Sequence, residues 1–445
     1  MTSAPSRQVH GIKIFPLVFP AKRHNDIQDS VDEIGPAVGR FDIKGNDMLG
    51  LKRIFSKELV VGVDIGSRLI KVVQAEAGRA PGQWRITRAA VAATPAESVR
   101  DGVVVDRTAV ATALRDLCGL AAIDANGAAI AISGTSVIVR HVKMPRMAES
   151  VLRNSVRFEA GKYISSSVED SLIEFEITGP VPGEADKMGV MLVAAPNDMV
   201  DSRLQTLAEA GLEPVAVDVE AFALQRALLE MTATRPGDGV TLALLDIGAA
   251  TTDVNIVTNG QFALTRTISI AGDQFTQNLK SLHPRLEWAE LEALKTRINM
   301  GALLQPEADP EAVALAKAVQ PVMDELLREV RRSMNYYQSQ LTDTANSNLP
   351  AGVTAETGGG AVSKIILSGG SARMEGLDAY MAARLGASVE VWNVFDNPAL
   401  DTSAFAPEFL QANFALLTNC VGLALKELME SAPARPVKRD VLQAA

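Results

Sequence analysis

Two aspartates, each at the end of an apolar run, carry the chemistry that this sequence suggests. The first copy reads L-V-V-G-V-D-I-G-S over residues 59–67, and the second reads L-A-L-L-D-I-G-A-A-T-T-D over residues 242–253. An apolar run that ends in glycine and small polar residues, with a β-prone run after it, predicts a strand, a turn and a second strand. A carboxylate at the tip of a buried strand indicates that a cation lies there.

The turn after each aspartate is suited to an anion. Glycine permits a sharp turn, and the small residues after it expose backbone N–H and hydroxyl groups, as phosphate-binding turns do. Two such turns facing each other would hold the phosphates of a nucleotide, while Asp64 and Asp246 would hold a hydrated Mg²⁺ through water. A pair of ordinary tight turns is the alternative, and the repetition in matching strand contexts argues against it. The predicted contacts are Asp64, Gly66, Ser67, Lys71, Asp246, Gly248, Ala249, Ala250, Thr251 and Thr252.

A third glycine motif lies further along the chain. Residues 364–377 read K-I-I-L-S-G-G-S-A-R-M-E-G-L, in which a short strand runs into two glycines and a helix begins near Ala372. Glycines let the backbone approach a ligand, and a helix N-terminus favours phosphate. This motif adds Ser368, Gly369, Gly370 and Ser371 to the predicted nucleotide site, and Gly272, directly before a predicted helix over 273–282, completes it.

In this order the three motifs resemble the actin-like ATPase superfamily, as its first phosphate loop, its second phosphate loop and its adenosine loop. The segments between them resemble the PilM family of type IV pilus assembly proteins, over residues 48–429. Two positions depart from that family, since Ser165 and Val394 stand where it usually has proline. The matching stretches are 144–145, 156–160, 163–164, 193–196, 210–214, 217–223, 265–266 and 422–425.

The expected fold class is α/β, a duplicated actin-like ATPase fold of two RNase H-like halves. Between the halves, the element order β-α-β-β-α-β predicts an inserted ferredoxin-like α+β subdomain. The resemblance implies that its position is shared with the cell-division protein FtsA. The expected boundaries are a disordered extension (1–47), first-half core (48–135), inserted subdomain (136–218), connecting helix (219–237), second-half core (238–283 and 363–403), helical subdomain (284–345), flexible loop (346–362), C-terminal helix returning to the first half (404–430) and disordered tail (431–445).

Composition excludes several classes of function. The net charge of −10 argues against binding of nucleic acid, which needs a basic face. Two cysteines and four scattered histidines indicate neither a disulfide nor a zinc site. No run approaches the roughly 20 apolar residues of a membrane span, and no signal peptide is visible, so the chain is expected in the cytoplasm.

The resemblance implies an ATP-binding scaffold for type IV pilus assembly and twitching motility, at the cytoplasmic face of the inner membrane. It would bind the N-terminal cytoplasmic segment of the pilus protein PilN in a groove beside the inserted subdomain, depending on nucleotide state. It would bind ATP and Mg²⁺ and hydrolyse ATP slowly if at all, and the resemblance allows a homo-oligomer. No catalytic residue is assigned, because no Glu or Gln stands in a recognisable activating position.

Two other functions of the same superfamily stay open. A filament-forming division protein similar to FtsA usually ends in a basic, aromatic amphipathic helix, whereas this chain ends in A-P-A-R-P-V-K-R-D-V-L-Q-A-A. A small-molecule kinase would need an acidic base beside the acceptor hydroxyl, for which Asp106 and Asp218 are the candidates.

Overall fold

The structure, a computed structural model, describes residues 13–14, 59–164, 167–231, 240–342, 349–350, 353–354 and 360–430. The expected disorder of residues 431–445, and of residues 1–47 apart from 13–14, concerns residues outside these ranges. Residues 13–14 lie within the extension that was expected to be disordered, but they form the short edge strand β1 (Lys13–Ile14). This strand pairs in parallel with residues 216–217.

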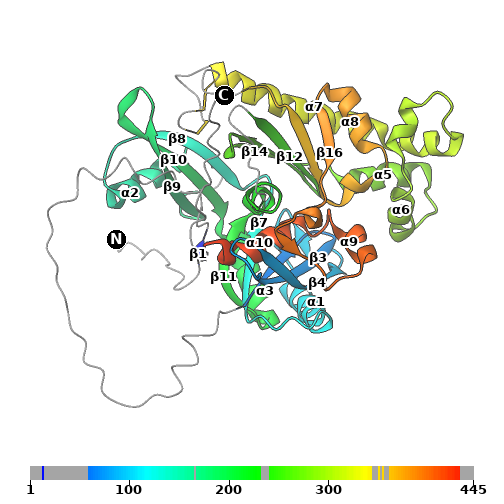
Figure 1. Cartoon of the computed structure of the whole chain (residues 1–445), viewed down its shortest axis with the longest axis horizontal. Helices are drawn as coiled ribbons and strands as arrows, with labels where there is room; N and C mark the ends of the chain where they lie inside the picture. Colours follow the sequence, from blue (N-terminus) through cyan, green and yellow to red (C-terminus); the bar gives the residue numbers. More distant parts are fainter. Residues whose placement is uncertain are drawn as a thin grey trace, which may run out of the picture.

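The first half is built on a seven-stranded sheet (Figure 1). Three of its strands form an antiparallel meander, and two further strands pair in parallel beside the first of them. The order across the sheet is β1, β11 (Glu213–Val219), β7 (Gly127–Ile132), β2 (Val60–Ile65), β3 (Leu69–Ala77), β4 (Trp84–Ala93) and β17 (Leu400–Asp401).

The second half repeats this arrangement in a five-stranded sheet. Its order is β14 (Gln261–Ile268), β13 (Thr252–Thr258), β12 (Thr241–Ile247), β15 (Lys364–Ser368) and β16 (Ser388–Val391). Again the first three strands in the chain form an antiparallel meander, and the other two are parallel to its first strand. The central strands are apolar and buried on both faces, as parallel strands covered by helices must be. The expected duplication of an α/β core is therefore confirmed.

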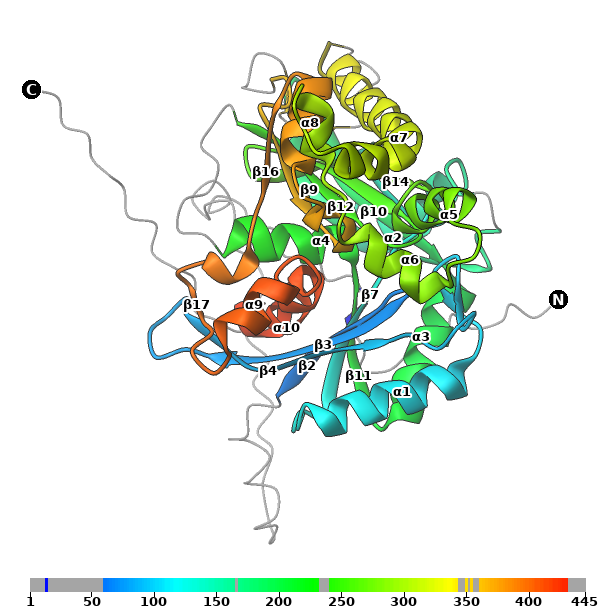
Figure 2. The same ribbon diagram turned by 90° about the vertical axis from the view of Figure 1, so that its right-hand side faces the viewer.

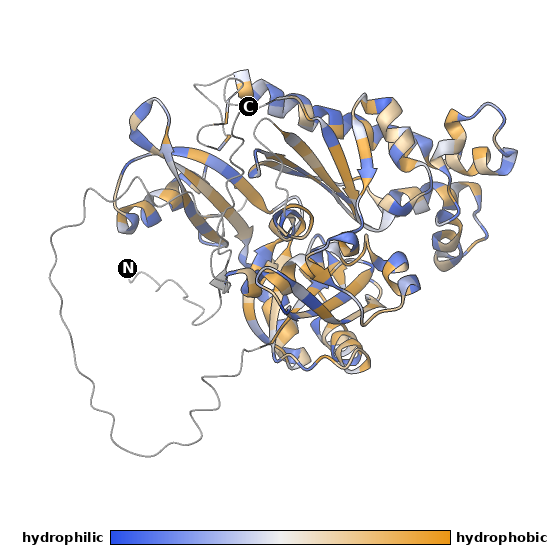
Figure 3. Ribbon diagram, viewed as in Figure 1, coloured by the Kyte–Doolittle hydropathy of each residue, from blue (hydrophilic) through white to orange (hydrophobic). Residues whose placement is uncertain are grey.

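Helices cover the outer faces and separate the two sheets (Figures 1 and 2). Between the sheets, apolar side chains of β3, β4, β12 and β15 pack on α4 (Glu220–Gln225), its π-helical continuation (Arg226–Glu230) and α10 (Thr418–Glu430). On the outer faces lie α1 (Arg107–Leu120) and α3 (Asn197–Ala210) for the first half, and α5 (Gly272–Leu282), α7 (Pro310–Thr342) and α8 (Leu377–Leu385) for the second. Figure 3 shows hydrophobic strands and more hydrophilic outer helices.

The inserted segment differs from the expected ferredoxin-like sandwich. Only β8 (Ile138–Pro145), β9 (Ser171–Val181) and β10 (Glu184–Pro196) form its sheet, in the order β8-β10-β9, and α2 (Glu149–Ala160) packs on one face around Leu152 and Val156. The strand and helix that would complete a ferredoxin-like unit belong to the first half. Strand β11 pairs with β7, and α3 packs into the first-half core through Leu204 and Leu207.

Two helices also differ from expectation. Although proline inside a helix removes a backbone hydrogen bond, α7 continues through Pro321 as one α-helix. The C-terminal helix expected within residues 404–430 is instead two helices, α9 (Pro407–Asn413) and α10, bent by 102°. The break frees the carbonyl of Ala415, which accepts a hydrogen bond of 3.1 Å from the Gly369 N–H. This interaction ties the end of the chain to the third glycine motif.

No single helix among the described residues is long and apolar enough to cross a bilayer. The pair α9 and α10 passes such a test only when the two are taken together across their bend.

Candidate functional site

The first predicted turn joins β2 to β3. Asp64, at 4% exposure, lies opposite Lys71, and its carboxylate oxygen is 2.6 Å from the lysine Nζ. Burial alone would lower the pKa of Lys71, but the Asp64 carboxylate raises it above its usual value. The turn is closed by a hydrogen bond from the Gly66 N–H to the Leu69 carbonyl, and the Thr94 hydroxyl donates to the Gly66 carbonyl at 2.8 Å. Ser67 lies in this turn, half-buried.

The second predicted turn joins β12 to β13 and rests on the start of α5. The Gly248 N–H donates to the Thr251 carbonyl, and the carbonyl of Gly248 accepts from the Gly272 N–H, both at 3.0 Å. The Thr252 hydroxyl donates to the Ile270 carbonyl at 2.7 Å. Ala249 and Ala250 form the tip, and the carbonyl of Ala249 accepts from the Asp273 N–H at 2.8 Å. The turn and the helix N-terminus therefore form one unit whose tip is accessible.

The third motif packs directly against the second aspartate. Ser368 lies beside Asp246 across the β12–β15 pair. Gly369 has φ +88°, and a Cβ there would overlap the Asp246 carboxylate and lie 2.5 Å from the Ile247 carbonyl oxygen. The Ser371 hydroxyl faces the Gly248 carbonyl at 3.5 Å. Gly370 lies between Gly369 and Ser371 in the chain. Only glycine permits this left-handed backbone and this close approach.

Four carboxyl groups meet between the two sheets. Asp253 lies opposite Asp246, as Lys71 lies opposite Asp64 in the other copy. Burial raises the pKa of Asp246 to about 6, although a hydrogen bond of 2.8 Å from the Asn419 amide lowers that pKa in part. Burial and the neighbouring Asp246 charge raise the pKa of Asp253 to about 7, although a hydrogen bond from Thr267 lowers that pKa in part.

Glu220 is the fourth carboxyl group, and the sequence did not identify it as a site residue. It opens α4 directly after β11. Burial, followed by the charges of Asp64, Asp253 and Asp246, raises its pKa to about 8. The sequence feature that could have identified Glu220 is a glutamate at the junction of an apolar strand and a helix. Such a concentration of acidic groups favours binding of a cation. Within the described residues, no three His, Cys, Asp or Glu side chains are arranged to ligate a metal directly, and a hydrated Mg²⁺ requires no such arrangement.

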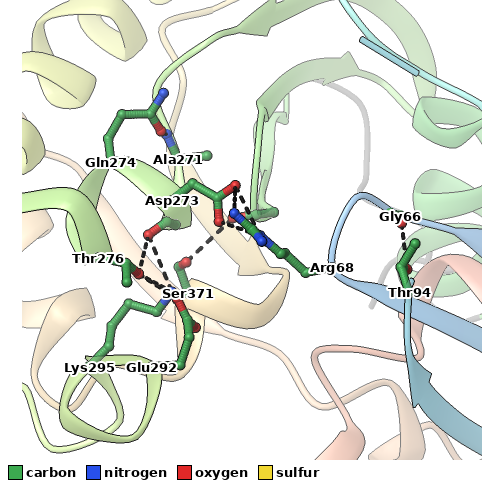
Figure 4. A network of polar contacts seen from close by, with 12 residues as sticks. Gly66, Arg68, Thr94, Ala271, Asp273, Gln274, Thr276, Glu292, Lys295 and Ser371 are labelled. Atoms are coloured by element: carbon green, nitrogen blue, oxygen red, sulfur yellow. Dashed lines mark hydrogen bonds and ion pairs between the residues drawn. The ribbon is translucent and has the colours of Figure 1, made fainter. Parts of the chain in front are cut away.

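On the second half, Glu292 and Lys295 of α6 (Trp288–Lys295) border the start of α5 (Figure 4). The Lys295 ammonium donates to the Gly272 carbonyl at 3.2 Å, to the Thr276 hydroxyl at 3.0 Å and to the Glu292 carboxylate at 2.8 Å. The sequence analysis did not identify Glu292 or Lys295 as site residues, because neither belongs to a glycine motif.

One ion pair joins the two halves beside these turns. Arg68 of the first turn contacts the Asp273 carboxylate at 3.1 Å (Figure 4). Its guanidinium also lies 4.6 Å from the ring centroid of Trp288. The pair therefore lies between the first turn and the start of α5.

The two acids considered for a kinase have structural partners. Asp106 caps α1 by accepting a hydrogen bond from the Ala109 N–H. Asp218 is fully buried, 3.0 Å from Arg226 and 3.3 Å from Lys426. Glu159 of α2 pairs locally with Lys162 at 2.6 Å.

Known proteins share this architecture. A family model described as type IV pilus assembly protein PilM matches residues 62–428. A chain from the solved PilM-PilN type IV pilus biogenesis complex is similar at a TM-score of 0.69 and 25% identity, over 85% of this chain and 99% of that chain. The ethanolamine utilization protein EutJ from Carboxydothermus hydrogenoformans has a TM-score of 0.48 and 19% identity, over 83% and 90%.

A partial similarity extends to the cell division protein FtsA of Pseudomonas aeruginosa, at 29% identity over 185 residues. That match covers 36% of this chain and 40% of FtsA, so the chain spans about two fifths of that relative's length.

Proposed function

Because this chain belongs to the PilM family of type IV pilus assembly proteins, we propose that it is a nucleotide-dependent scaffold of pilus assembly. Its fold is that of the actin-like ATPases.

The proposed nucleotide is ATP, bound between the halves with Mg²⁺. The turns at Gly66 and Gly248 would hold phosphates, and Asp64 and Asp246 would hold the metal through water. The observation that carries this proposal is the packing of Gly369 on Asp246, because it brings two of the glycine motifs to one point. On the second half, Lys295 and Glu292 would contact the nucleoside, since Lys295 already lies against the Gly272 carbonyl at the start of α5.

Hydrolysis, where it occurs, would depend on Glu220. A carboxyl group with a pKa of about 8 is mostly protonated at neutral pH and is a poor base. Hydrolysis would therefore be slow while Glu220 holds its proton, which suits a scaffold whose bound state must persist. A bound cation, which would lower that pKa, would speed hydrolysis.

The proposed partner is the N-terminal cytoplasmic segment of a PilN protein, since the similar solved structure is a PilM-PilN complex. A disordered segment that folds into a groove gives a specific and reversible link. The scaffold would thereby be held at the cytoplasmic face of the inner membrane. Helices α4 and α10 pack against both sheets. A bound nucleotide that changed the angle between the halves would therefore also move the inserted segment and change the affinity for the partner.

Calorimetric titration of the full chain with the N-terminal peptide of its PilN, with and without Mg-ATP, tests the proposal. We expect tight binding that depends on Mg-ATP and weakens in Asp246→Asn. The matched control is Asp116→Asn, which removes an exposed carboxylate from α1 and should change neither affinity. Absence of peptide binding while ATP still binds would exclude PilN as the partner.

The partial similarity to FtsA supports one alternative, a filament-forming protein. Sedimentation and electron microscopy with Mg-ATP separate the two functions, because long ATP-dependent filaments together with no peptide binding would favour the alternative. The kinase alternative loses its candidate bases, since Asp106 and Asp218 already serve the fold.

A further inference from the structure

Arg203 of α3 is a buried cation next to the first of the proposed phosphate turns. The residue is only 2% exposed. Its Nη1 donates to the Ile65 carbonyl at 3.1 Å, and its Nε donates to the Gly102 carbonyl at 3.2 Å. Ile65 ends β2 between Asp64 and Gly66, so the guanidinium holds the backbone that joins the aspartate to its turn.

The charge of Arg203 has no carboxylate bonded to it. Among the described residues the guanidinium forms no ion pair, and its printed partners are the two carbonyls. Burial lowers its pKa, while the charges of Glu220 and Asp64 raise that pKa. A buried cation without a direct partner is costly to keep in a protein. The nearby carboxyl groups offset part of this cost, which places Arg203 beside the proposed nucleotide site.

Gly102 lies where the inserted segment joins the first half. It occupies a tight turn with φ +81°, and a Cβ there would lie 2.8 Å from the Ser133 carbonyl oxygen and 2.9 Å from the Met199 Cε. Ser133 follows β7 on the way into the inserted segment, and Met199 follows β10 on the way out of it. Both connections of the inserted segment therefore pack on the turn that Arg203 holds.

Helix α3 is joined directly to the inserted sheet. Strand β10 is the middle strand of that sheet and ends at Pro196, and α3 begins at Asn197 with no residue between them. The Ser202 hydroxyl accepts a hydrogen bond of 3.2 Å from the Val104 N–H, just beyond the Gly102 turn. A displacement of β10 would therefore move α3, and Arg203 would transmit it to the Ile65 carbonyl.

We propose that Arg203 is a positioning residue that couples the first phosphate turn to the inserted segment. Mg-ATP bound at that turn would fix the Ile65 carbonyl, and Arg203 would in turn fix the Gly102 turn and α3. The inserted sheet would then open less often. This route lies within the first half and differs from a change of angle through α4 and α10. It rests on the proposed nucleotide function but not on the identity of the partner.

Hydrogen–deuterium exchange of the full chain, with and without saturating Mg-ATP, tests this coupling. In the wild type we expect Mg-ATP to slow exchange in β8 and β10 at least about fivefold. In Arg203→Met, which removes the donors, we expect a change of less than about twofold. Arg203→Lys should retain part of the protection, since an ammonium still donates to one carbonyl. Calorimetry sets the saturating concentration for each variant, so a weaker affinity alone cannot produce the loss.

Arg115→Met is the matched control. Arg115 of α1 also donates to a backbone carbonyl of α3, that of Glu209, and its printed bond does not involve the first turn. Its protection by Mg-ATP should equal that of the wild type. Thermal unfolding checks that each variant is folded. Where Arg203→Met does not fold, Ser202→Ala removes the contact with Val104 and should lower the protection at least about twofold.

Three results decide the outcome. Full protection in folded Arg203→Met, or in Ser202→Ala where it replaces that variant, would overturn the proposal. A wild-type chain that binds Mg-ATP without protection of β8 and β10 would also overturn it, while leaving the nucleotide function intact. A wild-type chain that binds no Mg-ATP would overturn the nucleotide function itself, and this inference with it.

Discussion

The guanidinium of Arg68 and the carboxylate of Asp273 form a bidentate ion pair between the two halves of the molecule. The distances Nε–Oδ1 and Nη2–Oδ2 are both 3.1 Å, and the guanidinium also stacks near Trp288. Arg68 lies in the first of the proposed phosphate turns, and Asp273 lies at the start of α5. The pair therefore bridges the two halves beside the proposed phosphate site.

Removal of this pair should speed nucleotide release more than it destabilises the fold. Both side chains are partly exposed, so we expect Arg68→Ala to change the free energy of unfolding by less than about 1 kcal/mol. We expect release of a fluorescent ATP analogue, followed by stopped flow, to be about fivefold faster. Arg68→Lys should not restore the slow rate, because lysine cannot make the bidentate contact.

Arg85→Ala is the control for this prediction. Arg85 forms a similarly exposed pair with Glu76 at the start of β4, the end of that strand that lies away from the first turn. A release rate unchanged in Arg68→Ala, or raised equally in Arg85→Ala, would show that the pair does not retain nucleotide.

Gly369→Ala should abolish most ATP binding. The substitution strains a backbone with positive φ and forces the new methyl group against Asp246. We expect a loss of about 1–3 kcal/mol in unfolding free energy and at least about a tenfold loss in calorimetric ATP affinity. Gly386→Ala is a matched control, since Gly386 also has positive φ but open space around its Cα. Wild-type ATP affinity in Gly369→Ala would contradict the site.

The nucleotide-free protein should become less stable as pH rises from 6 to 8. The pKa values of Asp253 (about 7) and Glu220 (about 8) are raised, mainly by burial, above those of unfolded carboxyl groups. The folded state therefore binds more protons than the unfolded state, and the associated stability is lost as pH rises through the folded pKa values. Denaturant unfolding at both pH values should show a decrease on the order of 1 kcal/mol.

Glu220→Gln should reduce this decrease, and saturating Mg²⁺ with ATP should oppose it, because a cation compensates the ionised carboxylates. A pH dependence that is the same in wild type and Glu220→Gln would show that Glu220 does not titrate in this range.

Asn419→Ala should weaken Mg-ATP binding most at acidic pH. The Asn419 amide donates to the Asp246 carboxylate at 2.8 Å and lowers its pKa. Without that bond the pKa of Asp246 rises above about 6, so more of the carboxyl group is protonated at pH 6. We expect a loss of about fivefold in affinity at pH 6 and a smaller loss at pH 8, measured by calorimetry.

Asn413→Ala is the comparison for Asn419, because Asn413 lies at the end of α9 and its amide donates to the Phe409 carbonyl instead of to Asp246. Equal losses at both pH values would assign Asn419 a packing role only.

Local sequence predicted those parts of the site that lie within short segments. Each strand-end aspartate is followed at once by its turn, so Asp64 with Gly66, and Asp246 with Gly248, were identifiable from spacing alone. Glu220 and Asn419 were not identified, because the aspartates with which they interact are far away in the chain. Lys295 was not identified, because it belongs to no glycine motif. The contact between Arg68 and Asp273 likewise depends on how the two halves face each other.

The inserted segment shows the same limit at the level of the fold. The order of its elements was predicted, but strand β11 and helix α3 joined the first half instead of the inserted sheet. A strand buried on both faces can pair at either sheet edge, and its own residues do not select between them. The sequence by itself determined the duplicated halves and the turns that follow Asp64 and Asp246, since these follow from residue type and short spacing. Only the tertiary structure decided which edge β11 occupies and which distant side chains complete the site, because pairing and packing between remote segments set both.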